Sequence, residues 1–390
     1  MPVPGVFDDK VCEVVLPPSS RKRVMEIRGR SVPDLQGRSG LIPRHVKVAF
    51  IGDTGCRVTQ THLQNCKSRS EWPLRDVLQG VAASGSDFVV HVGDYVYREE
   101  ECSDDSKCDK GIYGDKSATW AMDLLEPLQT ISDKLPFVFV RGNHEDCSRA
   151  HSGWFRYIDA FPMPAIGQKC EDVTSPWLIS LSRWNMGGDE FYVMDSASTP
   201  DEVTKEHNVD IAHYREMFSS GFGGVGEVSR LWLLTHKPLW AYSSRMGKPY
   251  YGDFFQVLAL GPAVMQRFTG VISGHVHAGQ LLQVSVPDGS VLSDGGSVRH
   301  QASGHIIQVI SGNAGSSLYS VGDNSSFAVG GYTVSDVRSV SGFGFCTLTI
   351  PPPSYYERVI SVIVGHRVSV PTVTLHNVRG EVLAECSVER

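Results

Sequence analysis

Five short apolar runs along this chain are each followed at once by a block of polar residues that can bind a metal ion. The runs cover residues 46–51, 88–92, 137–140, 231–234 and 271–272, the last with its flanking Phe268 and Thr269. They are rich in β-branched or aromatic residues and bounded by glycine or polar residues, which is typical of strands buried on both faces. Such strands are parallel, and helical crossovers join them, so their carboxyl ends meet at one sheet edge. The sequence therefore predicts an α/β fold in which one parallel sheet gathers the five blocks in a cleft.

The polar blocks share a supply of oxygen and nitrogen donors and contain no thiolate. They are Gly52-Asp53-Thr54-Gly55, Gly93-Asp94-Tyr95-Val96-Tyr97, Gly142-Asn143-His144-Glu145, Thr235-His236 and Gly274-His275-Val276-His277. The candidate metal ligands among them are Asp53, Asp94, Tyr97, Asn143, His236, His275 and His277. Seven donors exceed the needs of one tetrahedral ion and suit two ions that share a bridging carboxylate. Mixed oxygen and nitrogen ligation favours iron, manganese or catalytic zinc over structural zinc, so we expect a binuclear centre.

In this order, the blocks resemble the signature of the calcineurin-like metallophosphoesterases, and within that superfamily the small bacterial-type purple acid phosphatases. The general superfamily carries a histidine two residues after the first aspartate, where this chain has Gly55. The resemblance implies that Tyr97 supplies the missing ligand. A phenol ionises readily only beside a strongly charged ion, and Fe(III) meets that demand best.

The resemblance also implies how the donors and layers are arranged. The first ion, Fe(III), would take Asp53, Tyr97, His277 and the bridging Asp94. The second ion, Fe, Zn or Mn, would take Asp94, Asn143, His236 and His275. The implied fold is a four-layer α/β/β/α metallophosphoesterase sandwich with two central mixed β-sheets.

The chemistry expected of such a centre is hydrolysis of small phosphate monoesters, an acid-phosphatase-like activity. Two ions neutralise a phosphate oxygen and acidify a bound water, so a metal-bound hydroxide would attack phosphorus in line. His144 is the candidate for protonating the leaving oxygen or orienting the nucleophile, and supporting a ligand carboxylate is an equally good role for it. Arg149 and His151 follow in the same loop and are candidates for contacting the substrate phosphate, although loop residues of these types are more often solvated.

Two other functions compete with this one. A phosphodiesterase or nucleotide pyrophosphatase would use the same fold and metal centre, because loops outside the motifs decide which ester binds. A non-catalytic binding module is disfavoured, since all seven ligand positions are filled. Taken alone, each Gly-Asp pair is more often a turn than a metal site. The ordered occurrence of all five blocks, each behind a strand, is what favours the metal centre.

The net charge of −7 and the hydropathy of the chain limit its partners. No basic patch indicates a nucleic acid or an anionic membrane surface. No apolar run approaches the roughly 20 residues of a membrane span. We therefore expect a small phosphorylated substrate, with neither a nucleic acid nor a membrane as partner. The sequence does not predict an oligomeric state.

Cysteine placement favours an oxidising compartment. Three pairs close short loops beside the metal motifs and are candidate disulfides: Cys56 with Cys66, Cys102 with Cys108, and Cys147 with Cys170. Cys346 lies in a strand-like run and should be a buried thiol. We expect a secreted or otherwise extracytoplasmic protein. Because residues 1–30 lack the apolar core of a signal peptide, a cytoplasmic protein is the alternative.

The chain divides into three parts. Residues 1–45 form an N-terminal lead-in, residues 46–350 the catalytic domain, and residues 351–390 a β-rich extension that begins with three prolines. Helical patterns cover residues 72–84, 117–131 with an interruption at Pro127, and 209–218. A second sheet is expected from residues 178–181, 191–194, 281–286, 305–310 and 343–350. Residues 359–364 and 370–375 read as a hairpin or as edge strands covering the sandwich, and His91 as a hydrogen-bonded core histidine.

Overall fold

The computed structural model describes most of the chain from residue 45 onward. The described ranges are 45–159, 170–181, 189–204, 208–221, 230–245, 248–286, 305–322, 326–352 and 370–388, together with the antiparallel strands β1 (Met25–Ile27) and β2 (Arg30–Val32). Most of the lead-in, including Cys12, and the strand-like run 359–364 lie outside the described residues.

The first sheet has six strands in the order β20-β19-β18-β3-β6-β7. They are β3 (Val46–Ile51), β6 (Phe88–His91), β7 (Phe137–Phe139), β18 (Gly344–Ile350), β19 (Thr372–Asn377) and β20 (Val382–Ser387). β3, β6 and β7 are parallel, and β18 pairs antiparallel with β3. β19 and β20 continue the antiparallel half and extend this sheet to its edge.

The second sheet has eight strands in the order β16-β17-β14-β15-β13-β10-β9-β8. They are β8 (Trp177–Ser180), β9 (Asp189–Val193), β10 (Arg230–Leu234), β13 (Phe268–Ser273), β14 (Gly279–Ser285), β15 (His305–Ser311), β16 (Ser326–Val329) and β17 (Tyr332–Val340). β9, β10, β13 and β15 are parallel, whereas β8, β14, β16 and β17 pair antiparallel with their neighbours. Both sheets are therefore mixed.

The sequence expectation for strand partners was wrong in two places. The five motif strands do not share one parallel sheet, because β10 and β13 belong to the second sheet. Residues 343–350, expected in the second sheet, form β18 and pair with β3 in the first. The physical reason is that a buried strand has the same apolar pattern in either sheet, so the pattern does not specify its partner.

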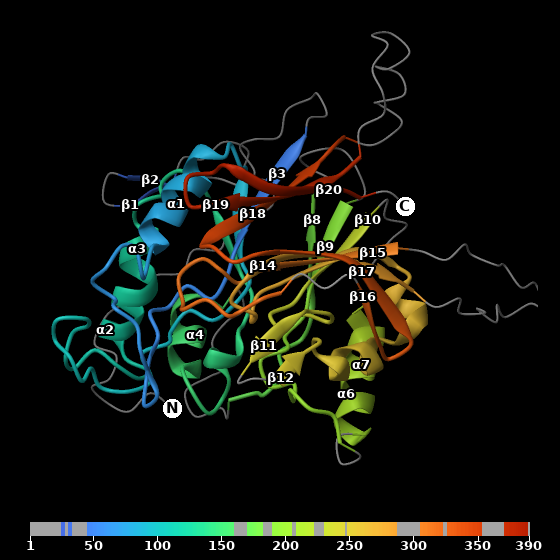
Figure 1. Cartoon of the computed structure of the whole chain (residues 1–390), viewed down its shortest axis with the longest axis horizontal. Coiled ribbons are helices and arrows are strands. Elements are labelled where there is room, and N and C mark those ends of the chain that lie inside the picture. The colour runs from blue at the N-terminus through green and yellow to red at the C-terminus, as the bar shows by residue number, and fades with distance from the viewer. Residues whose placement is uncertain are drawn as a thin grey trace, which may run out of the picture.

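Helices cover the outer faces of the two sheets, as Figure 1 shows. On the first sheet lie α1 (Leu74–Ala83), α2 (Ser117–Trp120), the π-helical η1 (Ala121–Leu125), α3 (Glu126–Leu128) and α4 (His151–Tyr157). On the second lie α6 (Asn208–Gly221) and α7 (Phe254–Met265). All three expected helical regions are thus present. Pro127 does not break its helix because it stands in the first turn of α3, where its missing N–H is not needed.

The core between the two sheets completes a four-layer α/β/β/α sandwich, which confirms the expected fold. Along β3, Val48 and Phe50 face the second sheet, while Ala49 and Ile51 face the helices. This alternation is the period of two that a strand imposes on its side chains. Within the described part of the chain, no helix is long and apolar enough to cross a membrane.

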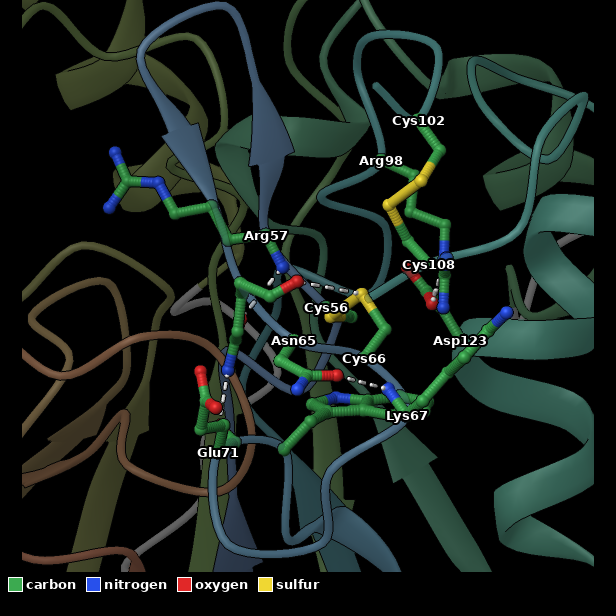
Figure 2. Close-up of a disulfide and its surroundings, with 12 residues drawn as sticks. Cys56, Arg57, Asn65, Cys66, Lys67, Glu71, Arg98, Cys102, Cys108 and Asp123 are labelled. Atoms are coloured by element: carbon green, nitrogen blue, oxygen red, sulfur yellow. Dashed lines mark hydrogen bonds and ion pairs between the residues drawn. A yellow bond between two sulfur atoms is a disulfide. The ribbon is translucent and has the colours of Figure 1, made fainter. Parts of the chain in front are cut away.

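The three expected disulfides are present: Cys56–Cys66, Cys102–Cys108 and Cys147–Cys170. The first two lie together in a small buried cluster with Val58, beside the hairpin of β4 (Val58–Thr59) and β5 (His62–Leu63) (Figure 2). Cys346 is a buried free thiol in β18, also as expected. Disulfides of this kind are typical of proteins in oxidising compartments.

Candidate metal centre

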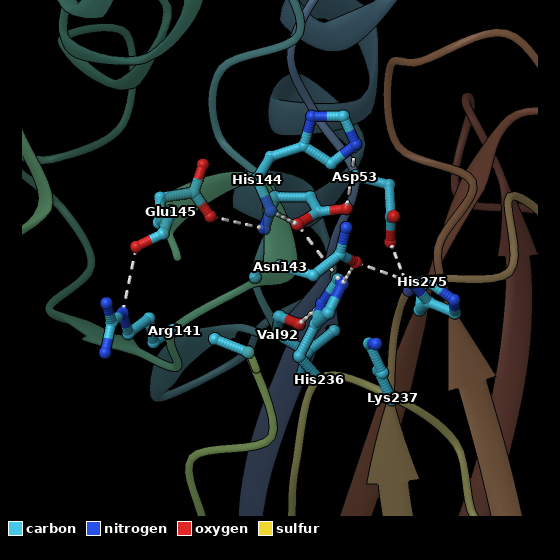
Figure 3. A network of polar contacts seen from close by, with 12 residues as sticks. Asp53, Val92, Arg141, Asn143, His144, Glu145, His236, Lys237 and His275 are labelled. Carbon is cyan, nitrogen blue, oxygen red and sulfur yellow. Dashed lines mark hydrogen bonds and ion pairs between the residues drawn. The ribbon is translucent and has the colours of Figure 1, made fainter. Parts of the chain in front are cut away.

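The seven candidate ligands converge at the carboxyl ends of strands from both sheets. Asp53 follows β3, Asp94 and Tyr97 follow β6, and Asn143 begins the 3₁₀ turn η2 (Asn143–Glu145) after β7. His236 follows β10, and His275 and His277 follow β13. Six of the seven are buried, and Asn143 is half-buried. Figure 3 shows the side chains of Asp53, Asn143, His236 and His275 turned toward one another.

Left-handed backbone positions three of these residues. The φ angle is 55° at Asp53, 61° at Asp94 and 67° at His275. Among the described non-glycine residues, only Asp336 also has a positive φ angle. Such conformations are costly for residues with a side chain and collect at functional sites. At these positions, the chain leaves its strand abruptly and directs the side chain across the sheet edge.

The first donor group surrounds the Tyr97 hydroxyl oxygen. This atom lies 2.9 Å from Asp53 Oδ1, 2.6 Å from Asp94 Oδ2 and 2.8 Å from His277 Nε2. His277 Nε2 is also 3.4 Å from Asp53 Oδ1. These are the residues expected to hold the first ion.

The second donor group surrounds the Asn143 side-chain oxygen. This oxygen is 3.0 Å from His236 Nε2 and 2.7 Å from His275 Nδ1. His236 Nε2 is in turn 3.2 Å from Asp94 Oδ1. One oxygen of Asp94 therefore faces each group, which is the position that a bridging carboxylate requires. Ligand atoms of Asp94, His236 and His275 all lie within 4.8 Å of one another.

Hydrogen bonds at Nδ1 determine which nitrogen of two histidines faces the donor groups. His236 Nδ1 lies 2.7 Å from the Val92 carbonyl oxygen, and His277 Nδ1 lies 2.7 Å from that of Ser317. A carbonyl only accepts, so Nδ1 carries the proton in each ring. The other nitrogen, Nε2, faces the oxygens described above and is the atom of each ring that a metal ion would bind. Nitrogen and oxygen donors gathered in a buried space are compatible with a cation among them.

The pKa shifts of the ionisable groups in the centre also indicate a site that favours positive charge. Burial opposes ionisation of Asp94, but His236 and His144 outweigh it and hold the pKa of Asp94 well below its usual value. Burial also lowers the pKa of His236, but Asp94 and Asp53 outweigh this effect and raise it to about 9. Burial, followed by the charges of Asp53 and Asp94, raises the pKa of Tyr97 well above 10. Tyr97 is thus a neutral phenol unless a strong positive charge displaces its proton.

Two residues outside the predicted set hold the Asp94 turn in place. Buried Glu145 accepts hydrogen bonds from the backbone N–H groups of Asp94 at 3.1 Å and Tyr95 at 2.9 Å. Arg141 Nε donates to the Glu145 carbonyl at 2.9 Å (Figure 3). Gly142 lies so close that a Cβ there would overlap the backbone nitrogen and carboxylate of Asp94. The Gly-Asn-His-Glu block thus supports the turn that carries Asp94.

His144 is close to the donor groups, whereas Arg149 and His151 are not. The His144 ring centroid is 3.9 Å from that of Tyr97, its backbone N–H donates to Asp94 Oδ1 at 2.9 Å, and its Nδ1 lies 3.0 Å from Glu99 Oε1. Arg149 reaches the same Glu99 oxygen at 3.6 Å and is largely exposed. His151 begins α4, and no contact within the described ranges joins it to the donor groups.

Several neighbours of the centre carry no motif and were not predicted. The Tyr319 ring stacks on His277 with a centroid distance of 4.2 Å. Lys237, directly after His236, lies 2.9 Å from Asp201 Oδ1, and that oxygen is 3.9 Å from His275 Nε2. The sequence signal that could have found such neighbours is adjacency to a candidate ligand. Lys237 directly follows His236 and Glu99 lies two residues after Tyr97, but Tyr319 is adjacent to no candidate ligand.

Comparison with known proteins identifies the family. The family model of calcineurin-like phosphoesterases matches residues 46–279, so the chain belongs to that family. This range contains all seven donor residues. Among curated proteins, none matches this chain.

Solved structures with a similar arrangement span several kinds of protein. The purple acid phosphatase PPD1 from yellow lupin (Lupinus luteus) seeds has a TM-score of 0.48 and 15% identity, over 88% of this chain and 53% of the lupin chain. PhoD has a TM-score of 0.51 and 10% identity, over 91% of this chain and 70% of its own. GAP50, the anchor in the inner membrane complex of Plasmodium, has a TM-score of 0.45 and 12% identity, over 88% of this chain and 89% of the GAP50 chain. The likeness to PhoD supports a shared fold.

Proposed function

We propose that the protein is a binuclear-metal phosphohydrolase of the purple acid phosphatase type, acting on phosphate monoesters of small molecules. Membership of the phosphoesterase family supports hydrolysis of phosphate esters as the class of reaction. The observation that carries the finer proposal is the position of Asp94, whose two carboxylate oxygens face two separate donor groups. A carboxylate in this position is suited to bridging two cations.

The residues divide between the two cations as follows. Asp53, Tyr97, His277 and Asp94 would hold Fe(III), and Asp94, Asn143, His236 and His275 would hold Fe, Zn or Mn. When bound, such a pair neutralises phosphate charge and acidifies water to supply the nucleophile. Tyr97 favours Fe(III) because its raised pKa demands a highly charged ion to replace the phenolic proton.

In this proposal, His144 would handle a proton at the leaving oxygen. Glu99 lies beside its Nδ1, which turns Nε2 toward the centre, 3.9 Å from Asp94 Oδ2. A histidine held by a carboxylate in this way has a fixed ring orientation. Arg149 would act through Glu99 as a positioning residue, rather than on the substrate phosphate. The three disulfides fit a secreted or otherwise extracytoplasmic enzyme.

The test compares Asp94→Asn with Asp336→Asn. Both aspartates have left-handed backbone, which asparagine tolerates, but Asp336 lies in β17 and pairs with Arg338 on the surface. We expect two metal ions per chain and hydrolysis of p-nitrophenyl phosphate for the wild type and Asp336→Asn. Asp94→Asn should lose metal and at least about 100-fold in kcat. Elemental analysis and steady-state kinetics measure both. A metal-free wild type, or full activity of Asp94→Asn, would contradict the proposal.

The same preparations identify the metal and the ester class. A phenolate ligand on Fe(III) gives visible absorption, so the wild type should be coloured and Tyr97→Phe colourless. A colourless wild type with two zinc ions and full activity would remove the iron assignment. A higher rate on bis(p-nitrophenyl) phosphate than on p-nitrophenyl phosphate would favour the phosphodiesterase alternative.

A further inference from the structure

We propose that Arg57 and His62 form a second anion-binding subsite beside the metal centre, which binds a second phosphoryl group of the substrate. The inference rests on the proposed function and narrows its substrate class to phosphorylated compounds that carry two phosphoryl groups. Both residues lie on the loop that the Cys56–Cys66 disulfide closes.

The loop is held rigidly by contacts at several points. The side-chain oxygen of Gln64 accepts the Arg57 backbone N–H at 2.8 Å, and its amide nitrogen donates to the carbonyls of Glu71 at 2.6 Å and Gly315 at 2.9 Å. The Trp72 indole donates to the Thr54 carbonyl at 2.8 Å. The backbone under Arg57 and His62 is therefore ordered before any ligand binds, which lowers the entropic cost of binding.

Both side chains flank the His277 side of the centre. Arg57 Cζ is 5.9 Å from the centroid of the Tyr319 ring, and that ring stacks on His277. His62 Nε2 lies 2.7 Å from the Ser317 hydroxyl, and the Ser317 carbonyl accepts the hydrogen bond from His277 Nδ1. One aromatic ring and one serine thus separate this pair from a predicted metal ligand.

The guanidinium of Arg57 has no anionic partner in the described part of the chain. Figure 2 shows the contrast with Arg98, which turns inward to Asp123 at 2.7 Å, while Arg57 points away from the disulfides. No described carboxylate lies within 4.0 Å of the Arg57 guanidinium, and its buried Nε has no hydrogen-bond partner there. Glu99, a carboxylate near this part of the site, is already occupied by His144 and Arg149.

The chemistry of these two groups indicates a phosphoryl ligand. A guanidinium presents a planar fork that matches two phosphoryl oxygens, and an imidazole beside it supplies one further donor. The cations of the centre would take the phosphoryl group that is hydrolysed. A substrate with an uncharged leaving group would leave Arg57 unused, whereas a pyrophosphate or other bisphosphorylated compound would engage both sites.

The test uses the metal-loaded full chain and the ratio of kcat/KM for pyrophosphate to that for p-nitrophenyl phosphate, in metal-buffered solution. Arg57→Gln should lower this ratio about 10- to 100-fold, the range for losing a hydrogen bond to a charged group. Arg57→Lys should recover only part of the loss, and His62→Gln should lower the ratio less. Arg69→Gln is the matched control, because Arg69 lies three residues after Cys66 in the sequence but pairs with Asp76 of α1. It should leave the ratio unchanged.

Calorimetry provides a readout that does not depend on turnover. The wild type should bind methylenebisphosphonate, a pyrophosphate analogue that cannot be hydrolysed, more tightly than inorganic phosphate, and Arg57→Gln should reduce that preference by a similar factor. An equal loss for both substrates and both ligands, or no loss, would overturn the subsite. A wild type that hydrolyses neither substrate but keeps the Arg57-dependent preference would refute the proposed function alone.

Discussion

At the scale of single residues, His91 shows how a histidine close to the centre can be purely structural. It is fully buried, its Nδ1 accepts the Gly93 N–H at 3.3 Å, and its Nε2 lies 2.8 Å from the Thr54 hydroxyl. The proton must then lie on Nε2, which donates to Thr54. Burial lowers the pKa of His91 to about 3, so the ring stays neutral in the folded protein. The expectation of a hydrogen-bonded core histidine is confirmed.

This neutral ring predicts an acid-sensitive contribution to stability. The unfolded chain protonates His91 near its ordinary pKa of 6.5, whereas the folded chain does so only near pH 3. Between these values the unfolded state binds the extra proton, so folding stability falls as pH falls, by about 1.4 kcal/mol per pH unit. We expect His91→Gln to flatten the fall in unfolding free energy between pH 6 and pH 4, measured by urea titration. The control is His305→Gln at an exposed position. Equal slopes for the wild type and His91→Gln would contradict this assignment.

At the scale of elements, the Cys56–Cys66 loop depends on its covalent closure. It carries only the two-residue strands β4 and β5, and its small core is built largely from disulfide sulfurs. We expect the Cys56→Ser/Cys66→Ser double variant to lose about 2–4 kcal/mol of unfolding free energy, because its unfolded state is less constrained. Urea unfolding measures this loss. The control, Cys386→Ser, removes a free and only partly buried thiol. Equal stability of the double variant and this control would show that the bond is dispensable.

The motif strands could be predicted from sequence, but their sheet partners could not. Short apolar runs followed by donors located β3, β6, β7, β10 and β13, and the donors at their ends do converge. The division into two sheets and the pairing of β18 with β3 depend on packing between distant segments. Tyr319 lies in the loop after β15, where nothing local marks it, so its stacking on His277 was not predictable.

At the scale of the whole molecule, the centre lies where the two sheets meet. The first sheet supplies Asp53, Asp94, Tyr97 and Asn143, and the second supplies His236, His275 and His277. A hydrogen bond from the Ser311 hydroxyl to the Phe50 carbonyl, 2.8 Å long, ties β15 to β3 just behind the donors. The distance between donor groups therefore depends on how tightly the sandwich packs.

The C-terminal strands contribute to that packing, so their removal should unfold the sandwich. Val373, Leu375 and Val388 are buried in the core between the sheets. Losing about 1.5–3 kcal/mol for each would consume most of a typical stability of about 5–15 kcal/mol. We expect a chain ending at Pro352 to show no cooperative thermal transition by circular dichroism. The control, Leu383→Ser, changes an exposed residue of β20 and should melt like the wild type. A truncated chain with the wild-type Tm would show that residues 353–390 are an independent appendage.

The left-handed backbone at Asp53, Asp94 and His275 also restricts how this family member can diverge. Most amino acids at these positions would weaken folding as well as remove a donor, because only asparagine, aspartate and glycine adopt this conformation at little cost. A descendant released from selection for activity would accordingly accumulate asparagine or glycine at 53 and 94 first. The substitutions found in such a lineage would still reflect the backbone constraint after catalytic activity had been lost.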